Sequence, residues 1–128
     1  MPNKSAIDFE YDPIVRGPCA IVAYARRANG KRPAKDYIQN LDRQDQAKLS
    51  KSFRTIAKTG NIWNKERFRN LSGKVYEFKV HPGRRILCFQ ENKTWYLTHG
   101  FNKQTGKTPP REIDRAKAIM GEHLSLSD

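Results

Sequence analysis

Cysteine is scarce in this 128-residue sequence, which contains only Cys19 and Cys88. The two lie far apart and lack the close spacing that is typical of zinc sites and of the disulfide frameworks of small secreted domains. We therefore expect two buried, reduced thiols in a cytoplasmic protein, with neither a metal site nor a cofactor.

Long apolar runs are missing as well. No stretch approaches the roughly 18 consecutive apolar residues that suggest a membrane-spanning helix, and the start of the chain does not resemble a signal peptide. The sequence therefore predicts a soluble intracellular protein with no membrane partner.

Acidic residues are few relative to basic ones: 13 Asp and Glu stand against 25 Lys and Arg, which gives a net charge of +12 and an isoelectric point near 10.0. Between Lys48 and Arg69 the only acid is Glu66, although a surface that is basic for solubility alone would usually mix the two signs. This balance favours a polyanionic partner, and among RNA, DNA and acidic proteins we consider a nucleic acid the better hypothesis.

The length suits one domain. Residues 1–18 mix charges with prolines and show no sustained hydrophobic period, so we expect a mobile arm or peripheral extension there. A single domain is expected over residues 19–124, followed by a short tail at 125–128.

Two helices are predicted after an initial apolar strand over Cys19–Ala25. Pro33 suits the first turn of one helix, and Asp42 can cap a second helix that ends at Gly60. The stripe of apolar residues on the second helix consists of Leu49, Phe53, Ile56 and Ala57.

Beyond Gly60 the hydrophobic period changes to two. VYEFKVH predicts a strand, Pro82-Gly83 a turn, and RRILCFQ and TWYLTHGF two further strands. Thr108 and Pro109 can open a last helix, whose predicted apolar stripe is Ile113, Ala116, Met120 and Leu124. Because the helices and strands are segregated along the chain, the fold class is predicted to be α+β.

The segment GFNKQTGKT looks at first like a phosphate-binding loop for a nucleotide. Such a loop needs four residues between its first glycine and the Gly-Lys pair, whereas five separate Gly100 from Gly106. Pro109 and Pro110 then remove amide donors where a phosphate-binding helix would supply them. We therefore reject a nucleotide site.

Several motifs occur together from Leu71 onward: LSGKVYEFKV, RRILCF and WYLTHGFNKQTGKTPPREIDRAKA. In this order, and with NGKRPAKDYIQNLD and LSKSFRTIAKTG upstream, they closely resemble the RelE/HigB/ParE superfamily of bacterial toxin-antitoxin toxins, specifically its phage-derived HigB-like branch. The resemblance runs from about Cys19 to Leu124. It implies a RelE-like sheet with an N-terminal strand and two helices packed on it, closed by a C-terminal helix.

The resemblance also implies a function. Such toxins are small basic endoribonucleases that commonly cut mRNA on the ribosome, and a cognate helix-turn-helix antitoxin neutralises them. Metal-independent cleavage by the neighbouring 2′-hydroxyl needs a base, cations that stabilise the gathering negative charge, and an acid for the leaving oxygen. The candidate catalytic residues are Lys79, Arg85, Lys103, Glu77 and His81, and the candidate RNA-binding residues are Arg84, Lys74, Lys107, Arg111 and Arg69.

Several of these roles have structural alternatives. Arg85 is the first choice for phosphate binding but could instead pair with Glu77 or Glu91. Glu77 could act as a base or, more in keeping with an ordinary carboxylate, hold a neighbouring cation in place. The hairpin register decides which arginine lies beside Lys79: a two-residue loop selects Arg84, and a three-residue loop selects Arg85.

Other side chains are expected to be structural or peripheral. His99 alternates with apolar neighbours and is expected in the core, whereas His81 beside a turn is expected at the surface. Trp63, Trp95 and Tyr76 could stack on bases, although a tryptophan in a strand, such as Trp95, is more often part of the core.

The sequence departs from the family pattern at three places. Arg84 stands where the family usually has an aromatic residue. No tyrosine lies beyond Tyr96, although classical ribosome-dependent members carry one in the closing helix, and Lys103 is a single lysine where the family keeps a basic pair. These departures leave two alternatives to a nuclease open: a non-catalytic ParE-like inhibitor of DNA gyrase, and a degenerate remnant that only binds nucleic acid.

Overall fold

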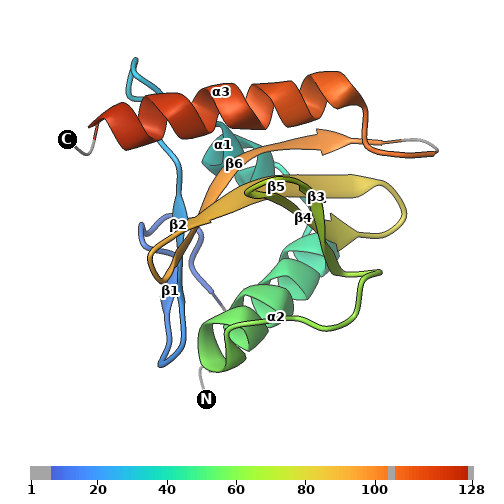
Figure 1. The fold of residues 1–128 in the computed structure, drawn as a ribbon. Helices are drawn as coiled ribbons and strands as arrows, with labels where there is room; N and C mark the ends of the chain where they lie inside the picture. Colours follow the sequence, from blue (N-terminus) through green and yellow to red (C-terminus); the bar gives the residue numbers. More distant parts are fainter. Residues whose placement is uncertain (1–6, 104–105, 127–128) are drawn as a thin grey trace.

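A mixed six-stranded sheet forms the centre of the computed structural model, which describes residues 7–103 and 106–126 (Figure 1). Its strands, in spatial order, are β1 (Val15–Arg16), β2 (Ile21–Tyr24), β6 (Thr94–Asn102), β5 (Arg84–Glu91), β4 (Val75–Val80) and β3 (Phe68–Ser72). Only the β2–β6 pair is parallel among these neighbours. The predicted α+β class with a partly mixed strand order is confirmed.

Three helices cover the two faces of this sheet. α1 (Pro33–Gln39) and α2 (Arg43–Thr59) pack on one face, and α3 (Pro110–Leu126) crosses the other (Figure 1). The main core lies under α2, where Phe53 contacts Phe78 edge to face at a centroid distance of 5.0 Å. Burying each such ring contributes about 1.5–3 kcal/mol to folding.

The ends of α2 agree with the sequence signals. The Asp42 carboxylate accepts a hydrogen bond from the Asp45 backbone N–H at 2.8 Å, which satisfies a donor in the first helical turn. Gly60 ends the helix in the left-handed region at φ +84°, where residues with a Cβ are disfavoured. The predicted apolar stripe from Leu49 to Ala57 is fully buried.

The segment before Cys19 differs from the expectation of a mobile or peripheral extension. Phe9 and Ile14 are 7% and 8% exposed and belong to the main core, and the Tyr24 hydroxyl donates to the Phe9 carbonyl at 2.7 Å. Residues 7–18 therefore help to build the core, with single apolar side chains between prolines and turns rather than with a periodic pattern. Residues 1–6 lie outside the described part of the chain.

Two smaller differences concern β3 and α3. The edge strand β3 was not predicted as a strand, because the letters FRNLS do not alternate between apolar and polar. On α3 the buried residues are Ala116, Ile119 and His123, whereas Ile113, Met120 and Leu124 are half-buried. His123 is buried because its ring packs on Tyr96 at a centroid distance of 4.3 Å.

The prediction of two buried thiols is wrong for one of them. Cys88 is buried in β5, but Cys19 is exposed because it lies in the turn between β1 and β2, before the interior strand begins at Ile21. Ser125 and Leu126, which were predicted to belong to a tail, are part of α3; residues 127–128 lie outside the described part.

Candidate functional site

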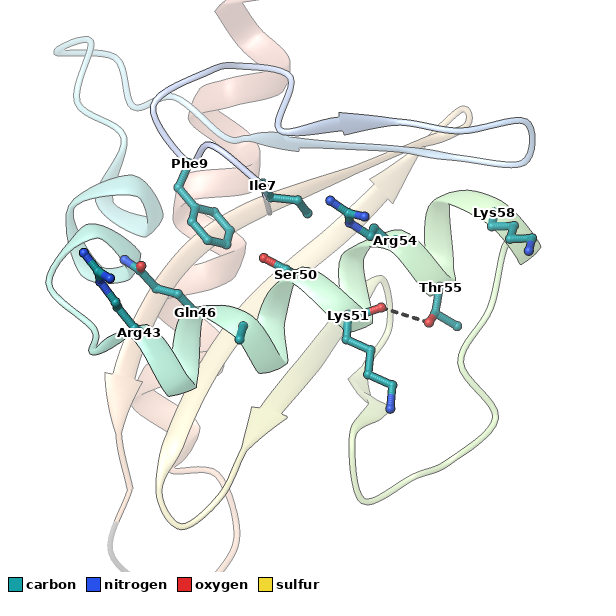
Figure 2. Close-up of a pocket in the computed structure, with 10 residues that line it drawn as sticks. Ile7, Phe9, Arg43, Gln46, Ser50, Lys51, Arg54, Thr55 and Lys58 are labelled. Atoms are coloured by element: carbon teal, nitrogen blue, oxygen red, sulfur yellow. Dashed lines mark hydrogen bonds between the residues drawn. The ribbon is translucent and has the colours of Figure 1, made fainter. Parts of the chain in front are cut away.

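The basic candidates and the cavity beside α2 lie in different places. A cavity of about 780 Å³ extends beside α2, and none of the candidate catalytic side chains lines it (Figure 2). Glu77, Lys79, Arg85 and Lys103 gather instead on the opposite face of the sheet, near the end of β4, the start of β5 and the end of β6. The chemistry is therefore sought on that face.

The register of the β4–β5 hairpin brings two of the candidates together. Val80 pairs with Arg84 and Lys79 with Arg85, so the connecting loop has three residues, from His81 to Gly83. The structure thereby selects Arg85, not Arg84, as the neighbour of Lys79. On the other side of β4, Glu77 pairs with Arg69 of β3.

Lys103 completes the group from the end of β6. Its backbone N–H donates to the Gly83 carbonyl at 2.7 Å, which ties the end of β6 to the hairpin loop. A Cβ on Gly83 would lie 2.3 Å from the Lys103 carbonyl oxygen, so this contact requires glycine. We call Arg69, Lys79, Arg85 and Lys103 the cation cluster.

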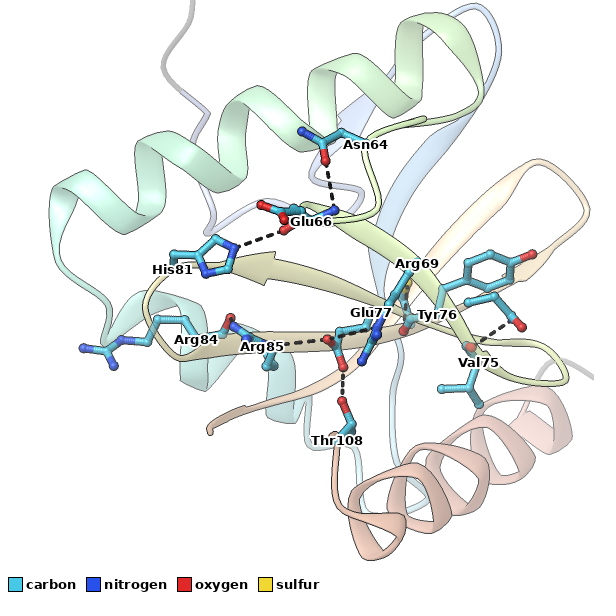
Figure 3. Close-up of polar contacts among 12 residues, drawn as sticks. Asn64, Glu66, Arg69, Val75, Tyr76, Glu77, His81, Arg84, Arg85 and Thr108 are labelled. Carbon is cyan, nitrogen blue, oxygen red and sulfur yellow. Dashed lines mark hydrogen bonds and ion pairs between the residues drawn. The ribbon is translucent and has the colours of Figure 1, made fainter. Parts of the chain in front are cut away.

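Glu77 lies at the centre of the cation cluster and is completely buried. Its Oε1 is 3.3 Å from Arg85 Nε and 4.0 Å from Arg69 Nε, and the Thr108 hydroxyl donates a short hydrogen bond to its Oε2 (Figure 3). Neither arginine Nε meets hydrogen-bond geometry toward Oε1, so the attraction there is that of opposite charges in a desolvated site. Glu77 thus binds two cluster members and the start of α3 at once.

The two lysines of the cluster are destabilised as cations. Desolvation and then the nearby Arg69 lower the pKa of Lys79; desolvation and then Arg85 lower the pKa of Lys103, while Glu77 partly opposes both shifts. Each lysine therefore lies in the positive potential of the other members. Such a site favours an anion, and its lysines release protons more readily than ordinary lysines do.

The remaining basic candidates lie around this centre. Arg84 is turned toward α2, with Nε 3.4 Å from Asp45 Oδ2, and Lys74 lies at the far end of β4, 3.7 Å from Glu91 Oε2. Lys107 and Arg111 are exposed on either side of the start of α3. The structure therefore separates Arg84 and Lys74 from the cation cluster and leaves Lys107 and Arg111 near Thr108 in sequence.

The three histidines occupy different environments. His81 is exposed, with Nε2 3.3 Å from the Glu66 carbonyl oxygen (Figure 3). His99 is buried as expected, with Nε2 3.0 Å from Glu112 Oε1, and burial lowers its pKa to about 4. Burial also lowers the pKa of His123. An accessible imidazole is thus found only at His81.

The aromatic candidates for base stacking also differ in how exposed they are. Trp63 is 85% exposed on the connection between α2 and β3, and Trp95 is buried against Phe68 and Tyr76. Trp95 is therefore part of the core, and Tyr76 is half-buried beside it.

Two residues of the site carried signals that sequence reasoning did not use fully. Thr108 was interpreted only as the opening of a helix, although Pro109 and Pro110 remove the two nearest amides that its hydroxyl could cap, which favours another partner. Gly100, the first glycine of the supposed phosphate loop, lies inside β6, and a Cβ there would be 2.0 Å from the Tyr37 ring. That glycine allows α1 to approach the sheet. Gln104, beside the single lysine of the basic pair, lies outside the described residues.

Two general properties concern the described residues only. They contain no group of three or more His, Cys, Asp or Glu side chains arranged to hold a metal ion. None of the helices in residues 7–103 and 106–126 is long and apolar enough to cross a membrane.

Residues 36–121 match the model of the family described as "Phage derived protein Gp49-like". No curated protein matches the chain. The matched range begins within α1 and contains all four members of the cation cluster, Glu77 and Thr108. It leaves out β1, β2 and the core-forming residues before them.

Proposed function

Since this chain belongs to the phage-derived Gp49-like family, we propose that it is the toxin of a type II toxin-antitoxin pair and cleaves mRNA. The family is related to toxins of the RelE/HigB kind, and its toxin-like character implies a cognate antitoxin. We assign the chain to the HigB-like branch on its HGF-x-K and K-T-P motifs, and we propose a cytoplasmic site of action, on mRNA bound to the ribosome.

The observation that carries this proposal is the cation cluster. In metal-independent cleavage the ribose 2′-oxygen forms a bond to phosphorus, the bond from phosphorus to the 5′-oxygen breaks, and a proton passes to that leaving oxygen. Negative charge gathers on the phosphate in the transition state, where preorganised cations stabilise it most. Lys79 and Lys103 supply accessible charge, while Arg85 and Arg69 raise the local potential.

Glu77 is assigned a positioning role in this mechanism. Its carboxylate is completely buried and already engaged by Arg85, Arg69 and Thr108, so a 2′-hydroxyl cannot approach it as it would a base. Proton transfer falls instead to groups that substrate can reach. We propose His81 as the base, since its imidazole is exposed in the loop between β4 and β5, and Lys79 or Lys103 as the acid, since their pKa values are lowered.

The RNA backbone on either side of the cleaved bond would contact further cations. Lys107 and Arg111 are exposed beside the start of α3 and suit this role, although Arg111 Nε also has a carboxylate nearby, Glu112 Oε2 at 3.9 Å. Arg84, Lys74 and Arg69 remain candidates, although the carboxylates that lie close to each of them reduce the positive charge that they offer to RNA.

One observation favours the second candidate function, a non-catalytic ParE-like inhibitor of DNA gyrase. Arg85, the expected phosphate ligand, is only 5% exposed and is paired with Glu77. A guanidinium in that position can hold the fold together without touching a substrate. The site would then be a remnant of nuclease ancestry, and the basic surface would serve protein recognition.

The test is tightly controlled expression of the chain with mapping of new RNA 5′ ends. Cleavage within reading frames is expected for the wild type, and a loss of at least about tenfold for Lys79→Ala or Lys103→Ala, since one donor at a developing charge often contributes about 10²–10³ in rate. Lys93→Ala is the matched control: Lys93 is an exposed lysine in the turn between β5 and β6 and should leave cleavage unchanged.

Two results would decide against the nuclease. Growth arrest with intact mRNA and blocked DNA supercoiling would support the gyrase inhibitor. Binding of RNA without new 5′ ends, unaffected by Lys79→Ala, would support a remnant that only binds nucleic acid.

A further inference from the structure

A groove runs along the outer side of α2, away from the cation cluster. Ile7 and Phe9 form one wall, and the length of α2 from Arg43 to Lys58 forms the other (Figure 2). Its volume is about 780 Å³. Nothing in the proposed cleavage of RNA uses this surface.

The shape of the groove fits a helix. Arg43 and Lys58 are fifteen helical steps apart, which corresponds to about 22 Å at the rise of an α-helix. A second helix of about 15 residues has the same length. Ile7 and Phe9 on one wall and Ala47 on the other provide apolar contacts for the apolar stripe of an amphipathic helix.

The charge of the groove selects an acidic occupant. Its described lining contains the four cations Arg43, Lys51, Arg54 and Lys58 and no Asp or Glu. Within it, Arg54 Nε is buried and has no hydrogen-bond partner among the described residues. A carboxylate from a bound segment would supply the acceptor that this donor lacks.

Other occupants fit less well. An RNA backbone would complement the cations but not the apolar side chains. The chain's own residues 1–6 include Lys4 and no acid, so their charge does not complement the walls. A second copy of the chain would bring its own net charge of +12 to a basic surface.

We propose that this groove binds an acidic amphipathic helix of a partner protein, with apolar residues against Phe9 and Ala47 and carboxylates against the flanking cations. In the proposed toxin this helix belongs to the cognate antitoxin, and to that extent the inference rests on the proposed function. The groove lies on the opposite side of the sheet from the cation cluster, so binding there leaves the cluster uncovered.

The test uses the full chain and a fluorescent, end-capped peptide of about 15 residues, with leucines along one helical face and glutamates on both flanks. Saturable binding is expected by fluorescence anisotropy, with shifts in the amide resonances of α2. A peptide of the same composition whose leucines are spread around the helix should bind at least about tenfold more weakly.

Paired charge reversals separate local contacts from net charge. Arg43→Glu with Lys51→Glu changes the groove, whereas Lys31→Glu with Lys93→Glu makes the same change of net charge at exposed positions outside it. The groove pair should weaken peptide binding by about tenfold or more, and the control pair by about twofold or less.

Four outcomes would overturn the proposal: no saturable binding, equal binding of the two peptides, equal loss in both charge-reversal pairs, or complete displacement of the peptide by a short RNA that itself shifts the α2 resonances. A dimer that only the groove pair dissociates would identify a second copy as the occupant and would also overturn it. Peptide binding is measured without RNA cleavage. A chain that binds the peptide but does not cleave RNA would contradict the proposed nuclease, whereas a chain that cleaves RNA but does not bind the peptide would contradict only the groove proposal.

Discussion

Glu77 carries a carboxylate that solvent does not reach, and its partners decide whether that burial is tolerable. Arg85 Nε at 3.3 Å is the nearest opposite charge, and Arg69 Nε is farther away at 4.0 Å. Removing one partner of a buried pair is costly because the other charge stays behind without compensation. Replacing both members of a buried pair by apolar residues is much better tolerated.

Arg85→Ala is therefore expected to lower the free energy of unfolding by about 3–5 kcal/mol. The double variant Arg85→Met with Glu77→Leu should recover a large part of that loss, since the buried carboxylate and its nearest cation are removed together. Urea denaturation of the single and double variants gives the comparison. A single variant within about 1 kcal/mol of wild type, or a double variant no better than the single, would contradict the assignment of a structural ion pair.

Helices and strands differ in how far their sequences revealed them. α2 was predictable because its cap, apolar stripe and terminating glycine all lie within 19 consecutive residues, from Asp42 to Gly60. β3 and residues 7–18 were not, because an edge strand and a proline-rich segment gain their structure from neighbours distant in sequence. The cation cluster was partly predictable. The sequence named its four members as candidates, but the contact of Thr108 with Glu77 and the burial of Arg85 depend on tertiary contacts.

Gly100 marks the contact between α1 and β6 and provides a test of that contact. Gly100→Ala should lower the free energy of unfolding by about 1–3 kcal/mol, because the new methyl group overlaps the Tyr37 ring. Gly121→Ala in α3 is the control, since a Cβ there meets nothing within 4 Å and helical alanine is favoured by up to about 1 kcal/mol. Thermal or urea denaturation measures both. Equal effects of the two substitutions would show that α1 does not approach β6 as described.

The contact between β6 and α3 depends on pH through His99. The pKa of His99 in the folded protein, about 4, lies below the ordinary histidine value of about 6.5, so the unfolded chain binds the proton more readily. Stability from this group is fully present above about pH 6.5 and is lost as pH falls toward 4. Urea denaturation should show lower stability at pH 5 than at pH 7. His99→Gln should flatten that dependence, and an unchanged slope in this variant would assign the effect to other groups.

The net charge of the whole protein determines how the proposed RNA binding should depend on salt. A net charge of +12 predicts strongly salt-dependent affinity, because each phosphate that a lysine or arginine neutralises releases counterions. Lys103→Ala should reduce the slope of log affinity against log salt by about 0.7–1 if Lys103 contacts a phosphate of single-stranded RNA. Filter binding of a short RNA at several salt concentrations measures the slope. Lys93→Ala should leave it unchanged, and equal slopes for wild type and Lys103→Ala would remove Lys103 from the interface.

The parallel pairing of β2 with β6 also bears on how the chain is made. Ile21 pairs with Thr94 and Tyr24 with Leu97, so the middle of the sheet cannot close until β6 has been synthesised. Thr108, which binds Glu77, comes later still. Contacts between such distant segments form after local ones. A growing chain therefore carries an incomplete cluster for most of its synthesis, and the site is complete only after β6 and Thr108 have been added.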